Sequence, residues 1–126
     1  MATSEYIPGV CNIGKVEIAS RRRIGVISTV VAVVIAILLF AFPVLPITRI
    51  VLFLSVFAAA SGFIQVRSHF CAGFGMTGLF NFGDELGKTD TAQQAEWRAK
   101  DKKRALTIVA QAVAIGLAVA VVAVLI

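Results

Sequence analysis

The chain has 126 residues, 59% of them hydrophobic, and its 12 Lys and Arg against 7 Asp and Glu give a net charge of +5. A mean hydropathy of +0.92 excludes a soluble multidomain enzyme. The basic residues stand where apolar blocks end, which is typical of membrane orientation and contact with anionic headgroups rather than of nucleic-acid binding. The composition therefore predicts an all-α membrane protein, with membrane lipids and no nucleic acid among its partners.

Residues 1–23 form a polar to amphipathic N-terminal segment that leads into the first apolar block. Glu17 stands four residues before Arg21, a spacing that places both on one helical face and predicts a helix beginning near Lys15. The apolar run 24–42 is long enough to cross a bilayer and longer than the apolar core of a signal peptide. We expect 24–42 to be the first of three transmembrane helices.

Two prolines end this helix and leave an outer turn over 43–46. A second apolar run, 47–66, predicts a second transmembrane helix, so the two form an antiparallel hairpin. Small residues in this run, Gly62 among them, allow close helix contact. Arg49 lies near the start of the run, and we expect its side chain to extend to the outer headgroups.

Residues 67–91 contain five glycines interleaved with four phenylalanines. The stretch is too aromatic for a solvated linker and too rich in glycine for a long helix, which predicts a compact loop packed on the membrane face or on the N-terminal segment. Asn12 and Asn81 adjoin glycine-containing turns. We expect both to hydrogen-bond backbone groups and pin the N-terminal segment to this loop.

Within the loop, residues 73–78 match the pattern G-x-G-x-x-G. A dinucleotide site needs a strand before that pattern and a helix after it, within a βαβ unit. A membrane helix precedes it here. We therefore interpret these glycines as positions for tight turns and close helix approach.

The last segment, 92–126, begins polar and then loses every charge. Thr91 and Gln94 have the spacing of a capping box, which predicts the start of a long helix. Its apolar part, 105–126, predicts the third transmembrane helix, because backbone groups in hydrocarbon must be satisfied internally. The polar part, 92–104, is expected to project into the aqueous phase and dock a partner.

The third span carries small residues on two faces, more than one hairpin partner uses, which predicts packing against other membrane protein subunits. These faces are Ala110-Ala114-Ala118 and Ala112-Gly116-Ala120.

Lysine and arginine predict the orientation. With three spans, 1–23 and 67–104 share one side, which holds all of the 12 Lys and Arg except Arg49. The positive-inside rule places this side, with the N-terminus, in the cytoplasm and the C-terminus outside. The basic and aromatic residues there are candidate contacts for anionic lipid or an acidic partner. They are Arg21, Arg22, Arg23, Trp97, Lys102, Lys103 and Arg104.

Cys11, His69 and Cys71 fall on this same side. They could supply three ligands to zinc or iron, with Asp84 or Glu85 as a fourth. Alternatively, the two cysteines could form a redox-active thiol pair. No C-x-x-C spacing brings them together, so half-buried thiols and an interfacial histidine remain the other interpretation. A bound lipid is the further candidate for a cofactor.

The stretches YIPGVCNIGKVEIASRRR and RSHFCAGFGMTGLFNFG resemble those of small uncharacterised bacterial three-span membrane proteins. The similarity covers most of the chain outside the last helix. It implies a bacterial source, and hence a multi-pass protein of the inner membrane, and it carries no activity.

The sequence contains no serine–histidine–acid set and no P-loop, and its spans hold no acidic residue. These features argue against an enzyme and against a monomeric transporter. We expect a small integral membrane subunit with a structural or assembly role in a larger inner-membrane complex. The alternatives are a cytoplasmic-facing thiol or metal site at Cys11, His69 and Cys71, and a homo-oligomeric channel or carrier.

Overall fold

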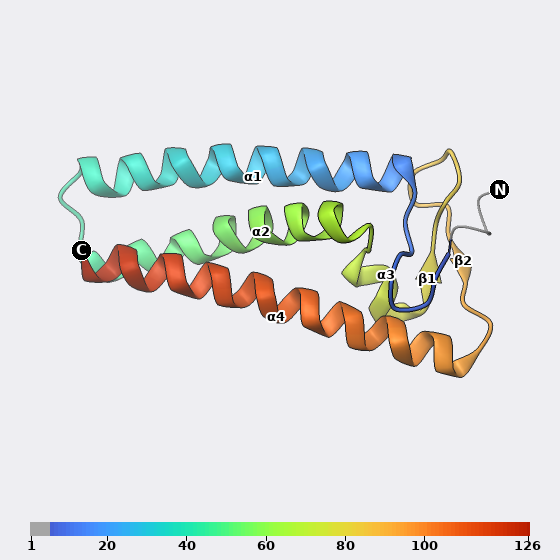
Figure 1. Ribbon diagram of the computed structural model, residues 1–126. Helices are drawn as coiled ribbons and strands as arrows, with labels where there is room; N and C mark the ends of the chain where they lie inside the picture. Colours follow the sequence, from blue (N-terminus) through green and yellow to red (C-terminus); the bar gives the residue numbers. More distant parts are fainter. Residues whose placement is uncertain (1–5) are drawn as a thin grey trace.

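The computed structural model, which describes residues 6–126, consists of long helices with a small polar unit at one end (Figure 1). The helices are α1 (Lys15–Ala41), α2 (Leu52–Ser68), which continues the 3-10 helix η2 (Pro46–Val51), and α4 (Ala95–Leu125). Three helices are long and apolar enough to cross a membrane, with η2 and α2 counting as one. The three predicted spans are confirmed at this level, and the chain has the makeup of a multi-pass membrane protein.

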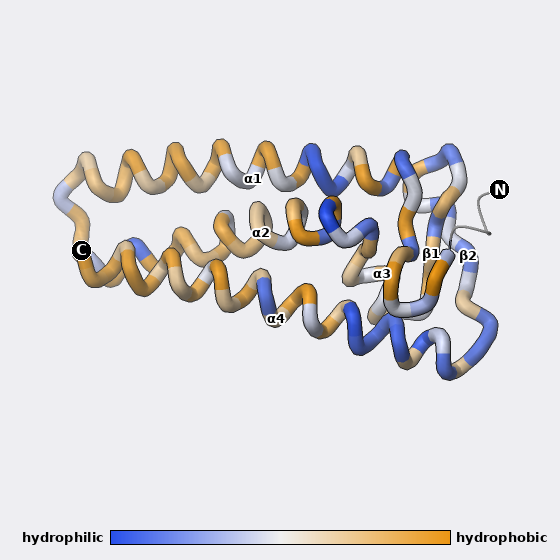
Figure 2. The backbone as a smooth tube through the Cα atoms, in the orientation of Figure 1, coloured by the Kyte–Doolittle hydropathy of each residue, from blue (hydrophilic) through white to orange (hydrophobic). Residues whose placement is uncertain are grey.

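The polar unit, called here the head, comprises residues 6–14 and 69–94. It contains α3 (Ala72–Thr77) and a short antiparallel pair of strands, β1 (Leu79–Phe80) and β2 (Asp90–Thr91). Figure 2 shows that the three-helix part is mainly hydrophobic and that hydrophilic residues gather in the head and the adjoining helix ends. The head lies where α1 and α4 begin and α2 ends, opposite the turn between α1 and η2 (Figure 1).

The antiparallel hairpin of α1 and α2 closes most tightly at two glycines. A Cβ atom on Gly62 would lie 2.8 Å from the backbone nitrogen of Gly25 and 2.9 Å from the carbonyl oxygen of Arg21. The ring of Phe63 covers Gly25 from α2, 3.1 Å from where a Cβ of Gly25 would be. The absence of side chains lets the two backbones meet, as helices in a bilayer require for strong dispersion contact.

Helix α4 packs on the other side of α2 with one of its two small faces. Ala112, Gly116 and Ala120 are buried, and a Cβ on Gly116 would lie 2.9 Å from the ring of Phe53. The second face, formed by Ala110, Ala114 and Ala118, is exposed. One predicted face is therefore packed within the chain, and the other is exposed in the described part of the chain, with Ala118 at the edge of a cavity lined by Ala36 and Leu52.

The predicted start of α4 is wrong. Thr91 belongs to β2, and the helix begins at Ala95 with Gln94 as N-cap and no side-chain capping bond. The strand pairing takes up residues that the capping-box spacing assigned to the helix. The part predicted to project, 92–104, packs one side on the head, where α3 meets it and Asp101 is fully buried, while Lys100, Lys102 and Lys103 are exposed. The docking of a partner by this part stays a prediction.

Arg49 also departs from its prediction. Its Nη1 donates a hydrogen bond to the carbonyl oxygen of Ala123 at 3.1 Å, and its guanidinium carbon lies 4.1 Å from the centre of the Phe40 ring. The side chain therefore turns inward and joins the last turns of α1 and α4 instead of extending to headgroups. A free carbonyl at the end of α4 and an aromatic face supply the contacts that water or lipid would otherwise give.

Candidate functional site

The N-terminal segment is fastened to the head by two buried asparagines. The backbone nitrogen of Asn12 donates to the His69 carbonyl at 3.1 Å, its side-chain amide donates to the Cys71 carbonyl at 3.1 Å, and its side-chain oxygen accepts from the Cys71 nitrogen at 2.6 Å. Asn81 donates its backbone N–H to the Asn12 carbonyl at 2.9 Å and accepts from Gly14 at 2.9 Å. The prediction that Asn12 and Asn81 pin this segment to the glycine-rich loop is confirmed.

Glu17, in the first turn of α1, is 2% exposed and is satisfied by three donors, two from the head and one from α1. Its Oε2 accepts from the Asn81 side chain at 2.8 Å and from the Gly87 backbone at 2.6 Å. Its Oε1 pairs with Arg21 at 3.1 Å, as the spacing predicted. A buried carboxylate is stable only with such partners, so Glu17 joins α1 to the head.

Arg21 serves this junction rather than the membrane surface. Its Nη2 donates to the Cys71 sulfur at 2.9 Å, and its guanidinium carbon lies 5.6 Å from the centre of the Phe74 ring. The side chain is only 15% exposed. The prediction of Arg21 as a lipid or partner contact is therefore replaced by a role inside the contact between α1 and the head.

Asp101 is the anchor of the N-terminal turn on α4. It is fully buried, and its two oxygens accept from the Tyr6 hydroxyl at 2.5 Å and the Gly9 backbone nitrogen at 2.7 Å. Pro8 and Gly9 form the turn, in which Gly9 has φ +74°, a conformation that glycine adopts without strain. The sequence reasoning missed Asp101, although a single acid inside a basic run, in register with a buried apolar stripe, is a signal for an inward carboxylate.

Aromatic rings complete this contact. The Tyr6 ring stacks on Phe80 with centroids 4.3 Å apart and meets the edge of Trp97 at 6.1 Å. Trp97 was expected at a membrane or partner surface, and it is half-buried against Tyr6. Burial is the largest cause that raises the pKa of Tyr6 well above its usual range. The hydrogen bond to Asp101 and the negative charge of Asp101 raise this pKa further.

This pKa shift predicts that the head loses stability in alkali. The unfolded chain releases the tyrosine proton near pH 10, whereas the folded chain retains it, so the contribution is complete below pH 10 and declines above it. We expect the wild-type head to weaken as the pH rises from about 10 to 12. Tyr6→Phe should lack this decline and be about 1 kcal/mol less stable at neutral pH. Fluorescence of Trp97, the sole tryptophan, follows the unfolding; an equal alkaline decline in both proteins would contradict the assignment.

The glycines of the G-x-G-x-x-G pattern lie in α3 and its C-cap; Gly75 and Gly78 pack against protein, whereas Gly73 is exposed. A Cβ on Gly75 would lie 2.6 Å from the Phe70 ring and 2.9 Å from the Asp101 carbonyl oxygen. Gly78 has φ +76° at the C-cap, beside the Arg98 side chain. The predicted use of these glycines in tight turns and close helix approach is confirmed for Gly75 and Gly78.

The predicted metal ligands do not gather. Among residues 6–126 no group of three His, Cys, Asp or Glu side chains is placed to hold a metal ion. His69 is exposed in a left-handed C-cap with φ 51°, Cys71 is 4% exposed, and no disulfide joins Cys11 to Cys71. Asp84 and Glu85 are exposed. The metal hypothesis therefore lacks its geometry in the described part of the chain.

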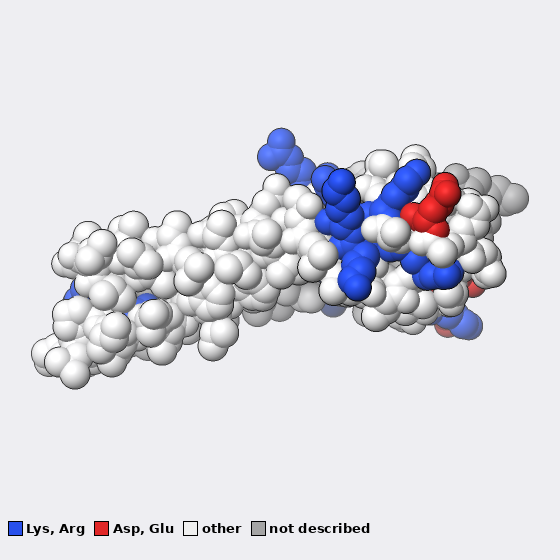
Figure 3. All heavy atoms as spheres, turned by 90° about the horizontal axis from the view of Figure 1, so that it is seen from below, with Lys and Arg blue, Asp and Glu red and all other residues white. Residues whose placement is uncertain are grey.

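The remaining predicted basic contacts lie at the junction of the apolar helices and the head. Arg22, Arg23, Lys102 and Lys103 are exposed, and Figure 3 shows Lys and Arg gathered over this junction on the face it displays. Arg104 is half-buried, and its Nε has no hydrogen-bond partner among the described residues. This basic belt matches the level at which a membrane-inserted chain would meet lipid headgroups.

A comparison with protein-family models, curated proteins and solved structures finds no match to this chain.

Proposed function

We propose that this protein is a small three-span subunit with a structural or assembly role in a larger complex of the bacterial inner membrane. The observation that carries the proposal is the exposed face of α4 formed by Ala110, Ala114 and Ala118. The small residues on the opposite face of the same helix pack closely on α2, so a face of this kind allows close contact between helices. Lipid gives helices no hydrophobic reason to associate, so faces that allow close approach favour a neighbouring helix.

We further propose that the head lies in the cytoplasm and the C-terminus outside. The fold supports this orientation, since it gathers at the head end every Lys and Arg of the described residues except Arg49. Positive charge is retained on the cytoplasmic side of inserted helices. The head would then present its outer surface to cytoplasmic parts of the complex.

The test is the mass and composition of the particle extracted gently from native membranes, for the wild type and for Ala114→Phe. We expect the wild type in a large heteromeric particle and Ala114→Phe largely released from it, because a ring on this face prevents close helix contact. Val34→Phe is the control, since it places the same ring at an exposed position of α1. A wild type that runs as a lone chain would contradict the proposal, and a small homo-oligomer would favour a channel or carrier.

A further inference from the structure

An apolar groove runs along the membrane part of the molecule. Helix α2 lies between α1 and α4, and residues of all three helices line an open groove whose floor is α2. It consists of two adjoining cavities of about 480 Å³ and 390 Å³, which share Ala36, Leu52 and Val119. Every residue that lines either of the two cavities is apolar, except Thr29.

At the end of the groove nearest the head, the lining changes from apolar to polar side chains. A third cavity, of about 300 Å³, is lined by Ile64, Arg67, Ser68, Arg104 and Gln111. Ile64 also lines the groove, so the two spaces adjoin. The helical register agrees with this continuity: Ser68 follows Ile64 by one turn of α2, and Gln111 precedes the groove residue Ile115 by one turn of α4.

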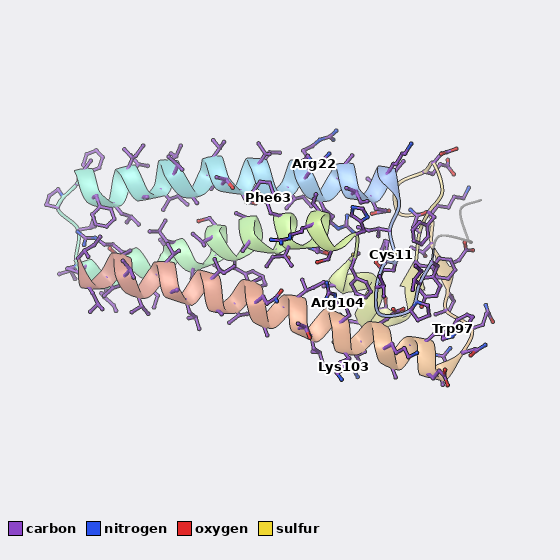
Figure 4. All side chains as sticks on the ribbon, in the orientation of Figure 1. Cys11, Arg22, Phe63, Trp97, Lys103 and Arg104 are labelled. Carbon is purple, nitrogen blue, oxygen red and sulfur yellow. The ribbon has the colours of Figure 1, made fainter. Side chains whose placement is uncertain are left out.

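The polar cavity is suited to an anion. Two guanidinium groups, a hydroxyl and an amide line it, and none of the described residues that line it is an acid. The Nε of Arg104 is buried without a hydrogen-bond partner among residues 6–126, and Arg67 is exposed. Figure 4 shows Arg104 on the side of α4 that faces α2, with Lys103 on the other side. Guanidinium groups bind phosphate oxygens through paired, charge-assisted hydrogen bonds.

We propose that this combined surface binds one anionic glycerophospholipid. The phosphate lies between Arg67 and Arg104, with Ser68 and Gln111 as further hydrogen-bond partners, and an acyl chain lies in the groove between α1 and α4. Charge complementarity selects the headgroup, and continuity with an apolar groove at membrane depth selects a lipid over a free phosphate. The lipid would pair with the guanidinium groups that line the cavity and fill space that the three helices leave open. This site goes beyond the proposed subunit role and does not depend on it.

The test measures lipid binding to the whole purified chain in detergent by native mass spectrometry, with dioleoyl phosphatidylglycerol and dioleoyl phosphatidylcholine as probes. The two lipids share acyl chains and phosphate and differ in net charge. We expect tighter binding of phosphatidylglycerol, and a loss of about tenfold in Arg104→Gln and in Arg67→Gln, because each removes a charged hydrogen bond. Lys88→Gln removes the same charge at an exposed position of the head that does not line the cavity, and it should bind as the wild type does.

A second variant tests the apolar part of the site. Ala60 lines the groove, so Ala60→Phe should weaken phosphatidylglycerol binding while leaving both arginines in place. Equal binding of the two lipids would show that charge does not select the headgroup, and an equal loss in Lys88→Gln would show only a general attraction of charge; either result would overturn the site. Competition by millimolar inorganic phosphate would identify a free-anion site instead. If Arg104→Gln failed to fold, Arg67→Gln, at an exposed position, would still decide the question.

Discussion

Gly62→Ala is expected to lower the free energy of unfolding by about 3 kcal/mol, the upper end of the range for overpacked cores. The added Cβ would lie 2.8 Å from the Gly25 nitrogen and 2.9 Å from the Arg21 carbonyl oxygen. Both are backbone atoms of α1, so no rotation of a side chain can relieve the contact. The two helices must separate, and the dispersion contacts along the hairpin weaken with them.

The measurement is thermal unfolding in detergent, followed by the circular dichroism of the helices. Gly73→Ala is the matched control, because its Cβ would have its nearest neighbour, the Cys71 sulfur, at 3.8 Å. Alanine also favours helix over glycine, so the control should be neutral or slightly stabilising. Equal stability of Gly62→Ala and the wild type would show that α1 and α2 do not meet at this glycine.

Glu17→Ala should have the second large effect, opening the head while leaving the three long helices formed. The change removes the acceptor of the Asn81 side chain and the Gly87 N–H, and it leaves the guanidinium of Arg21, which is 15% exposed, without its carboxylate. Removing one partner of a buried ion pair costs about 3–5 kcal/mol, because the other charge stays desolvated.

The thiol of Cys71 reports this opening, since it is 4% exposed in the closed head. In a Cys11→Ser background, alkylation of Cys71 should be faster by about a hundredfold or more in Glu17→Ala, as a loss of some 3 kcal/mol implies. Glu85→Ala is the control, because its ion pair with Lys88 is exposed and should contribute within about 0.5 kcal/mol. Unchanged reactivity of Cys71 in Glu17→Ala would remove Glu17 from the role of joining α1 to the head.

The spans and the asparagine contacts could be predicted from the sequence because each depends on a local signal. Continuous apolar runs have few stable arrangements once backbone groups must be satisfied within the segment. Asn12 and Asn81 stand beside turn-forming glycines, where a side-chain amide finds backbone partners. The spacing of Glu17 and Arg21 likewise located the start of α1 at Lys15.

The errors concern side chains whose partners lie far away in the sequence. Arg49 was assigned to headgroups because its inward partners, Phe40 and the carbonyl of Ala123, become neighbours only when α1 and α4 end at the same level. Asp101 was read as part of a solvated basic run because its partners, Tyr6 and Gly9, are more than ninety residues earlier in the chain. Local patterns cannot supply such contacts.

The hydrogen bonds of the head join distant parts of the sequence, and this determines when the head can form during synthesis. Its hydrogen bonds join residues 59 positions apart at Asn12 and Cys71, and 95 apart at Tyr6 and Asp101. Translation must therefore pass the first turns of α4 before the N-terminal turn has its anchor, so the α1–α2 hairpin is synthesised while the head is still open. Closure further requires that the N-terminus, the loop and the start of α4 be on one side of the bilayer. A chain inserted with a span inverted or missing would keep Asn12, Glu17 and Asp101 unsatisfied, and proteases that survey the membrane could recognise it by that open head.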